Sequence, residues 1–224
     1  MSNANSQPTF NVEDEVSNGI RLLGERRFEA AYTHFYQVID ELKRRQAGDA
    51  SVSQDLAAAY DYAERSAYGQ ARGSDVSDSR EWLLRALTAG ECSAAIREQL
   101  LRASPNPHFE LRGRMLTQLQ VLSLEHMGLG NFDKALELAR RSAKFQEDRQ
   151  EHGTVPMFYL SACGNEAMVL FRQKRLDDAL RAVNKALHSF DPESLDDADG
   201  LKCYAKLCEM KATIIGARNA KKLN

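Results

Sequence analysis

The side chains that could perform chemistry are few and scattered along this sequence. Asp148 and His152 stand four residues apart and could give two metal ligands, but a stable metal site needs more than two. Cysteines occur at positions 92, 163, 203 and 208, with no CxxC pair and no neighbouring histidine cluster. We therefore expect no metal site, and we interpret the cysteines as reduced and mostly buried.

The sequence also lacks the motifs that accompany common reactions. It contains no GxSxG, HExxH or P-loop motif, and no GxGxxG motif followed by an acidic residue. The carboxylate pairs Asp177–Asp178 and Asp196–Asp197 fall where helices are expected to begin, and there they would complement the helix dipole. The sequence therefore predicts no catalytic residue, no cofactor and a protein that is not an enzyme.

Composition narrows the possible partners. The formal net charge is −2, whereas a dedicated nucleic-acid binder usually has a basic surface. We interpret the basic clusters at 43–45, 140–141 and 221–222 as solvated helix ends, with an RNA or phosphate contact as the alternative. No apolar run approaches the roughly 20 residues that span a bilayer, and residues 1–10 lack the features of a signal peptide. We expect a cytoplasmic protein without membrane contact, in which residues 1–10 form a disordered tail.

A repeated pattern organises the chain. Phe132 with Ala135 is followed 44 residues later by Leu176 with Ala179, and an earlier copy begins at Phe28. Each copy lies inside an amphipathic helical run, and such a repeat predicts stacked helix–turn–helix units. The expected helices run over 11–26, 28–46, 54–72, 78–90, 91–103, 108–129, 132–151, 156–174, 176–190 and 195–217.

Glycine, proline and capping residues predict where the helices begin and end. Gly90 is expected to end a helix, and Asp78 is expected to start one as part of a capping box. The prolines within 104–107 predict a junction between a helical subdomain over 11–103 and a second one over 108–217. The second subdomain would hold two repeats and a capping helix, followed by a basic C-terminal tail over 218–224.

The small and aromatic residues of the repeats resemble those of the tetratricopeptide repeat family. Gly19, Ser123 and Ala167 match its close-contact positions in the first helix of a pair, and Ala135 and Ala179 match those in the second. The resemblance covers about half of the chain, with a spacing of 44 residues where the family has about 34. It implies an all-α fold, a right-handed α–α superhelix of antiparallel helix pairs.

The resemblance also implies a binding groove along the first helix of each pair. The corresponding groove residues are Thr117, Gln120, Leu124, Met127, Ser161, Met168 and Arg172, with Glu13, Val16, Ile20 and Gly24 in the first copy. A groove that grips a C-terminal carboxylate needs several cationic side chains, and only Arg172 qualifies. We therefore expect a partly apolar groove suited to a partner helix, although Met127 and Met168 could equally be core residues.

These features predict a non-enzymatic adaptor or scaffold that binds another protein or a peptide. The alternatives are a peptide-responsive sensor hinged at 104–107 and, less favoured, a nucleic-acid-associated repeat protein; a homodimer is also open. Tyr60, Tyr62 and Tyr68, with Trp82 nearby, could form an aromatic ligand pocket, but core packing is the favoured interpretation.

Overall fold

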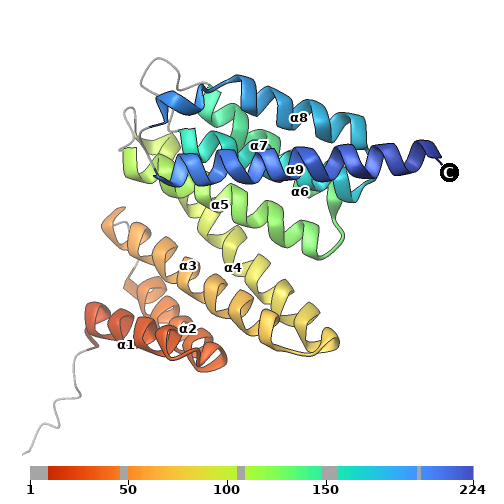
Figure 1. The fold of residues 1–224 in the computed structure, drawn as a ribbon. Coiled ribbons are helices and arrows are strands. Elements are labelled where there is room, and N and C mark those ends of the chain that lie inside the picture. Colours follow the sequence, from red (N-terminus) through yellow and green to blue (C-terminus); the bar gives the residue numbers. More distant parts are fainter. Residues whose placement is uncertain (1–9, 46–49, 105–108, 148–155, 196–197, 224) are drawn as a thin grey trace, which may run out of the picture. The chain divides into compact units, whose positions relative to one another are not determined.

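The computed structural model describes residues 10–45, 50–104, 109–147, 156–195 and 198–223, and these residues form α-helices, connecting turns and one short 3-10 helix. The chain divides into two compact units, Met1–Asn106 and Pro107–Asn224 (Figure 1). Within the described residues no strand is present, so the predicted all-α class is confirmed. Residues 1–9 of the expected tail over 1–10, the prolines of the junction, and Asp148 with His152 lie outside the described residues. The expectation of disorder is wrong at Phe10, which packs against the core of unit 1 and accepts a hydrogen bond from Arg45 at its carbonyl.

Unit 1 consists of two helical hairpins packed against each other. Its helices are α1 (Val12–Gly24), α2 (Phe28–Arg45), α3 (Ala50–Gly73) and α4 (Val76–Ala103). Asn11 caps α1, because its side-chain oxygen accepts a hydrogen bond from the Glu13 amide. Each helix packs against the next one along the chain, and α1 also contacts α3. Buried aliphatic and aromatic side chains of α2 and α3 fill the centre of this unit.

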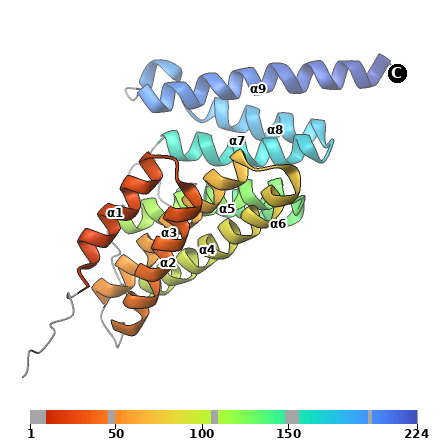
Figure 2. The ribbon, with the colours of Figure 1, turned by 90° about the horizontal axis from the view of Figure 1, so that it is seen from below.

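Unit 2 repeats the hairpin arrangement and adds one long helix. It contains α5 (Phe109–Gly128), α6 (Phe132–Glu147), α7 (Pro156–Arg172), α8 (Leu176–His188), the 3-10 helix η2 (Pro192–Ser194) and α9 (Ala198–Leu223). The second view shows α7, α8 and α9 as successive layers, with α9 at the edge of the unit (Figure 2). Helix α9 packs against both α7 and α8, as expected of a capping helix.

Small side chains let the paired helices approach each other closely. Ala31, Ala135 and Ala179 occupy equivalent places in α2, α6 and α8, and none of them has any exposed surface. In the first pair, a Cβ atom added to Gly19 would lie only 2.5 Å from Cζ of Phe35, which is itself fully buried. The repeated alanines therefore mark helix crossings, as the sequence pattern predicts.

The turn inside each pair has the same left-handed backbone. Arg26, Gly130 and Lys174 have φ values of 57°, 82° and 61°, and they occupy equivalent positions in the three copies. The amide of each donates to the carbonyl three residues earlier, at 3.0, 3.1 and 2.9 Å. The next amide donates to the carbonyl five residues earlier, at 3.0, 2.8 and 2.9 Å. This is the Schellman arrangement, in which glycine is the least strained residue at the left-handed position.

Replacing Arg26 by glycine is therefore expected to stabilise unit 1 by about 1 kcal/mol, because a side chain at this backbone conformation costs energy. Denaturant unfolding followed by the fluorescence of Trp82, which lies in unit 1, would measure the gain. The reciprocal change, Gly130→Ala, should destabilise unit 2 by a similar amount, because alanine is strained at the left-handed backbone of Gly130 although an added Cβ atom would meet no other group. Far-ultraviolet circular dichroism during unfolding would measure this loss, since Trp82 reports on unit 1. An unchanged midpoint for both variants would contradict the strain argument.

Three local expectations are wrong. Gly90 does not end a helix: it is buried within the continuous α4, where packing against α3 outweighs the roughly 1 kcal/mol cost of a helical glycine. Asp78 lies in the first turn of α4 rather than at its start, because Asp75 is the N-cap residue. Helix α9 continues through the expected basic tail to Leu223, which gives residues 218–223 a helical conformation.

Candidate functional site

The first helices of the two pairs in unit 2 form the layer on which the expected groove would lie. Helix α5 contacts α7, and α7 contacts α9, so these helices lie side by side. The expected groove residues come from α5 and α7. Thr117 and Arg172 are exposed, whereas Leu124, Met127, Ser161 and Met168 are half-buried. The layer therefore offers solvent a mixed surface of apolar and small polar side chains.

Gln120 differs from the other expected groove residues because it is buried between helices. Its side-chain nitrogen donates to the Phe158 carbonyl at 2.9 Å, and the Asn165 side chain donates to the Gln120 carbonyl at 3.3 Å. These two hydrogen bonds join α5 to α7 and satisfy polar groups that the packing removes from water. Gln120 is therefore a residue that holds the layer together, not one available to a partner.

The two methionines have different surroundings. Met127 packs against the hydrophobic core of unit 2, which agrees with the interpretation of the methionines as core residues. Met168 is half-buried, whereas its neighbours Ala167 and Val169 have no exposed surface. Its flexible thioether therefore lies at the edge of the packed interior, where it can adapt to an apolar partner.

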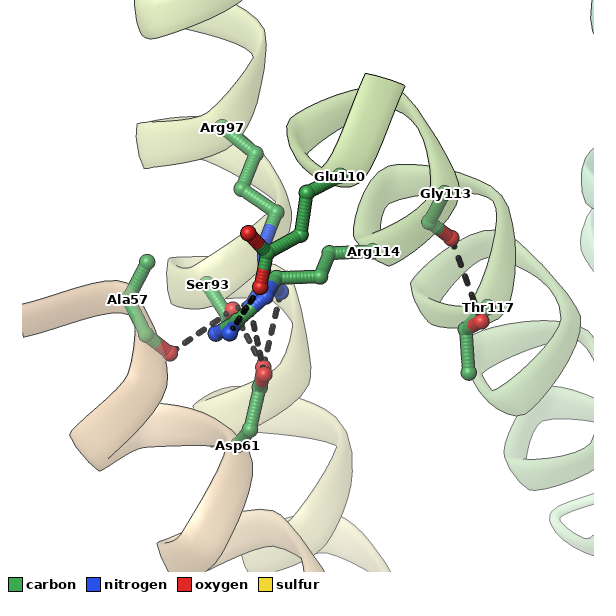
Figure 3. A network of polar contacts seen from close by, with 8 residues as sticks. All are labelled: Ala57, Asp61, Ser93, Arg97, Glu110, Gly113, Arg114 and Thr117. Carbon is green, nitrogen blue, oxygen red and sulfur yellow. Dashed lines mark hydrogen bonds and ion pairs between the residues drawn. The ribbon is translucent and has the colours of Figure 1, made fainter. Parts of the chain in front are cut away.

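The remaining expected groove positions contribute less. The Thr117 hydroxyl donates to the Gly113 carbonyl of its own helix at 3.1 Å (Figure 3). In unit 1, Val16 packs against the core, whereas Ile20 exposes 43 % of its surface. Ile20 is thus the apolar side chain on α1 that a partner of unit 1 could cover.

An ion pair between the buried Arg97 and Asp61, whose side chain is 20 % exposed, joins α3 to α4 in unit 1, and no sequence motif indicates it. The Asp61 carboxylate accepts hydrogen bonds from the Ser93 hydroxyl at 2.6 Å and from Nη1 of Arg97 at 2.8 Å (Figure 3). Nη2 of Arg97 also binds the second carboxylate oxygen, so the pair is bidentate. The Ala57 carbonyl lies 3.0 Å from the same Ser93 hydroxyl oxygen and shares its single hydrogen with Asp61. With only 2 % of Arg97 exposed, this network is structural rather than a binding site.

The aromatic residues of unit 1 form packed core, as the favoured interpretation predicts. Tyr60 is buried, Tyr62 stacks on Phe35 with ring centroids 5.0 Å apart, and Tyr68 packs against the buried cluster that contains Trp82. Burial also raises the pKa of Tyr60, since its phenolate would be poorly solvated. The hydroxyls and rings are therefore used for packing, and no aromatic ligand pocket is needed to explain them.

A basic pocket of about 590 Å³ opens where the start of α8 meets the C-terminal part of α9. It is lined by Lys174, Arg175, Leu176, Asp177, Asp178, Arg181, Arg218 and Lys221. Five basic and two acidic side chains give the lining a formal charge of +3. The two carboxylates are engaged: Arg218 pairs with Asp177 at 2.9 Å, and Arg175 pairs with Asp178 at 2.7 Å.

These ion pairs show what the basic pocket can do chemically. The hydrogen bond from Arg175, together with the charge of Arg181, lowers the pKa of Asp178, so this carboxyl stays ionised. An added anionic group would have to compete with both carboxylates for the same guanidinium groups. Charged side chains thus surround this pocket at one end of unit 2. Its basic residues come from two segments that lie far apart in the sequence, 174–181 and 218–221, so no single sequence motif indicates it.

Other candidate chemistry is sparse in the part of the chain that the structure describes. No group of three metal-ligating side chains comes together there. Cys163 is buried and Cys92 and Cys203 are half-buried, but Cys208 is exposed, so the expectation of mostly buried cysteines is only partly right. Arg44 and Arg45 pair with Glu41, as expected for charges at a helix end. Among the described helices, none has the length and apolar character to cross a membrane.

Paired antiparallel helices with repeated alanine crossings and left-handed turns define a tetratricopeptide-like helical repeat protein. No protein-family model and no curated protein matches this sequence. BtubC (BKLC) from P. vanneervenii has a similar solved structure, with a TM-score of 0.58 and 14 % identity, covering 93 % of this chain and 81 % of that one. At this identity the likeness concerns the fold alone.

Two further solved structures align with lower TM-scores. A thermophilic TPR protein from Thermus thermophilus, TTC0263, aligns with a TM-score of 0.44 and 17 % identity over 88 % of this chain and 99 % of that one. The apo form of the quorum sensor NprR from B. thuringiensis aligns with a TM-score of 0.42 and 11 % identity over 90 % of this chain and 59 % of that one.

Proposed function

We propose that this protein is a non-enzymatic interaction module that binds a helix or peptide of another protein along the α5–α7 layer of unit 2. One observation carries the proposal: two helices in contact present Leu124 and Met168 at the edge of the packed interior, with Thr117 and Arg172 exposed around them. An amphipathic helix docks on such a surface by covering apolar side chains, while rim charges select its orientation.

The chemistry of the layer argues for an apolar rather than an anionic partner segment. Arg172 is the one cation among the proposed contact residues, which is too few to hold a C-terminal carboxylate by several charge-assisted hydrogen bonds. Met168 and Leu124 can instead adjust to the side chains of a partner helix, because both retain some exposed surface. Gln120 and Met127 are left out of the contact set because each is already engaged in packing.

Selection from a displayed library of helical peptides tests this proposal. We expect the enriched peptides to carry apolar residues at helical spacing, and Met168→Glu should weaken their binding about tenfold or more. Leu84→Glu is the matched control, since Leu84 is an exposed leucine on α4 in unit 1 and should leave binding unchanged. Equal binding by the Met168→Glu variant, or submicromolar binding of an acidic C-terminal pentapeptide, would contradict the proposed site.

A further inference from the structure

Helix α9 uses one face to attach to the rest of unit 2. Leu207 and Ile214 are buried, seven residues apart, and Cys203, Tyr204 and Met210 pack partly against the same core. This face therefore accounts for the contacts of α9 with α7 and α8.

The other face of α9 carries a second apolar stripe that is exposed along its whole length. We call it the α9 seam, and it consists of Ala198, Leu201, Ala205, Cys208, Ala212 and Ile215. The intervals alternate between three and four residues, which is the repeat of a coiled-coil interface. Leu201 and Ile215 expose 44 % and 38 % of their surface, although large aliphatic residues gain energy from burial.

The seam is complementary to an antiparallel copy of itself. Seam positions alternate between two sets, as the a and d positions of a coiled coil do. One set holds alanine at 198, 205 and 212, and the other set holds Leu201, Cys208 and Ile215. In an antiparallel pair the two sets of positions face each other, so one register sets Leu201 against the second copy's Ala212 and Ala205 against its Cys208. The same register sets Ala198 against Ile215. Each larger side chain then meets a small one, as close helix packing requires.

A parallel pair of the same helices would be poorly matched. Each seam residue would face its own copy, so alanine would meet alanine and leave gaps, while Leu201 would meet Leu201. Such a parallel interface would have voids at the alanine layers and crowding at the layers of larger side chains, and it would lose dispersion contacts. The composition of the seam thus favours the antiparallel orientation.

Charges beside the seam agree with this register. Lys202 follows Leu201 and Glu209 follows Cys208 on the same side of the seam, and antiparallel pairing brings Lys202 next to the second copy's Glu209 and the reverse. Both side chains are exposed, and Lys202 pairs within its own helix with Asp199 at 2.9 Å. Opposite charges in these flanking positions set partner and orientation.

We infer that α9 is a self-association surface, and that two copies of this chain pair through antiparallel α9 helices in the register that sets Leu201 against Ala212. From Ala198 to Ile215 the seam is about 26 Å long, at about 1.5 Å per residue. Such a short interface predicts a reversible dimer in the micromolar range.

Sedimentation velocity over a range of concentrations tests the association. We expect the wild-type chain to dimerise and Ala205→Glu to be monomeric, because the variant places a charge in the centre of the seam. Lys206→Glu, an exposed change one residue outside the seam, should dimerise like the wild type. Lys202→Glu should weaken the dimer several-fold, and adding Glu209→Lys should restore it. Circular dichroism confirms that each variant is folded.

Disulfide trapping tests the register. In a Cys208→Ser background, an equimolar mixture of Leu201→Cys and Ala212→Cys chains should yield a cross-linked heterodimer on oxidation, whereas either chain alone should not. Cross-linking of the Leu201→Cys chain with itself would indicate a parallel pair and overturn the register. The proposal would be overturned if the wild-type chain stayed monomeric at several hundred micromolar, or if Ala205→Glu left the dimer unaffected. The α9 seam would then not be the self-association surface of this chain.

Discussion

Replacing Asp61 by alanine is expected to lower the free energy of unfolding of unit 1 by about 3–5 kcal/mol. The carboxylate accepts hydrogen bonds from both Ser93 and Arg97, and removing it leaves the Arg97 guanidinium buried without this counter-charge. A buried charge that loses its partner costs far more than the pair contributes when intact. Urea unfolding followed by Trp82 fluorescence would report the loss in unit 1.

Two further variants separate the charge effect from a general loss of packing. Asp61→Leu combined with Arg97→Met should recover much of the lost stability, because apolar residues of similar size can replace a buried ion pair. Glu25→Ala removes an exposed partner of Arg21 in the same unit and should change stability by less than about 1 kcal/mol. A similarly small effect of Asp61→Ala would show that the network contributes little to the fold.

How much of the fold the sequence predicts depends on whether a segment repeats. The alanines at 31, 135 and 179 each follow a large apolar residue by three positions, and this local pattern recurs in each repeat. The helix pairs, their turns and the all-α class therefore follow from local sequence signals. No such repeat covers α3 and α4. There the expectation that a glycine ends a helix is wrong, because Gly90 lies inside α4. A glycine tolerates a helix interior when the surrounding helices bury it, and burial is a property of the packed chain rather than of the neighbouring residues.

The candidate sites are harder to predict than the fold. Asp61 and Arg97 are 36 residues apart on different helices, so their pairing becomes visible only once α3 and α4 are packed. The groove residues share one helix face in sequence, but Gln120 proves to be a hydrogen-bonded link between α5 and α7. The α9 seam is different, because its spacing can be read from the sequence, yet only the structure shows that Leu201 and Ile215 are left exposed.

Ile214→Ala and Ile215→Ala are expected to have very different effects although they are neighbours of identical chemistry. Ile214 has no exposed surface and anchors α9 in the core of unit 2, so its truncation should cost about 3 kcal/mol, through lost burial and the cavity left behind. Ile215 exposes 38 % of its surface on the α9 seam, and its truncation should cost less than about 1 kcal/mol in the monomer.

The pair of variants separates the two faces of α9. Urea unfolding followed by far-ultraviolet circular dichroism at low micromolar concentration measures the monomer, where the Ile214→Ala loss should dominate. At high concentration the ranking of effects on self-association should reverse, because Ile215 lies in the proposed dimer seam and Ile214 faces the core. Equal losses of stability from both variants would mean that α9 does not pack on unit 2 through the face containing Leu207 and Ile214. The assignment of the α9 seam to the exposed face would then be wrong.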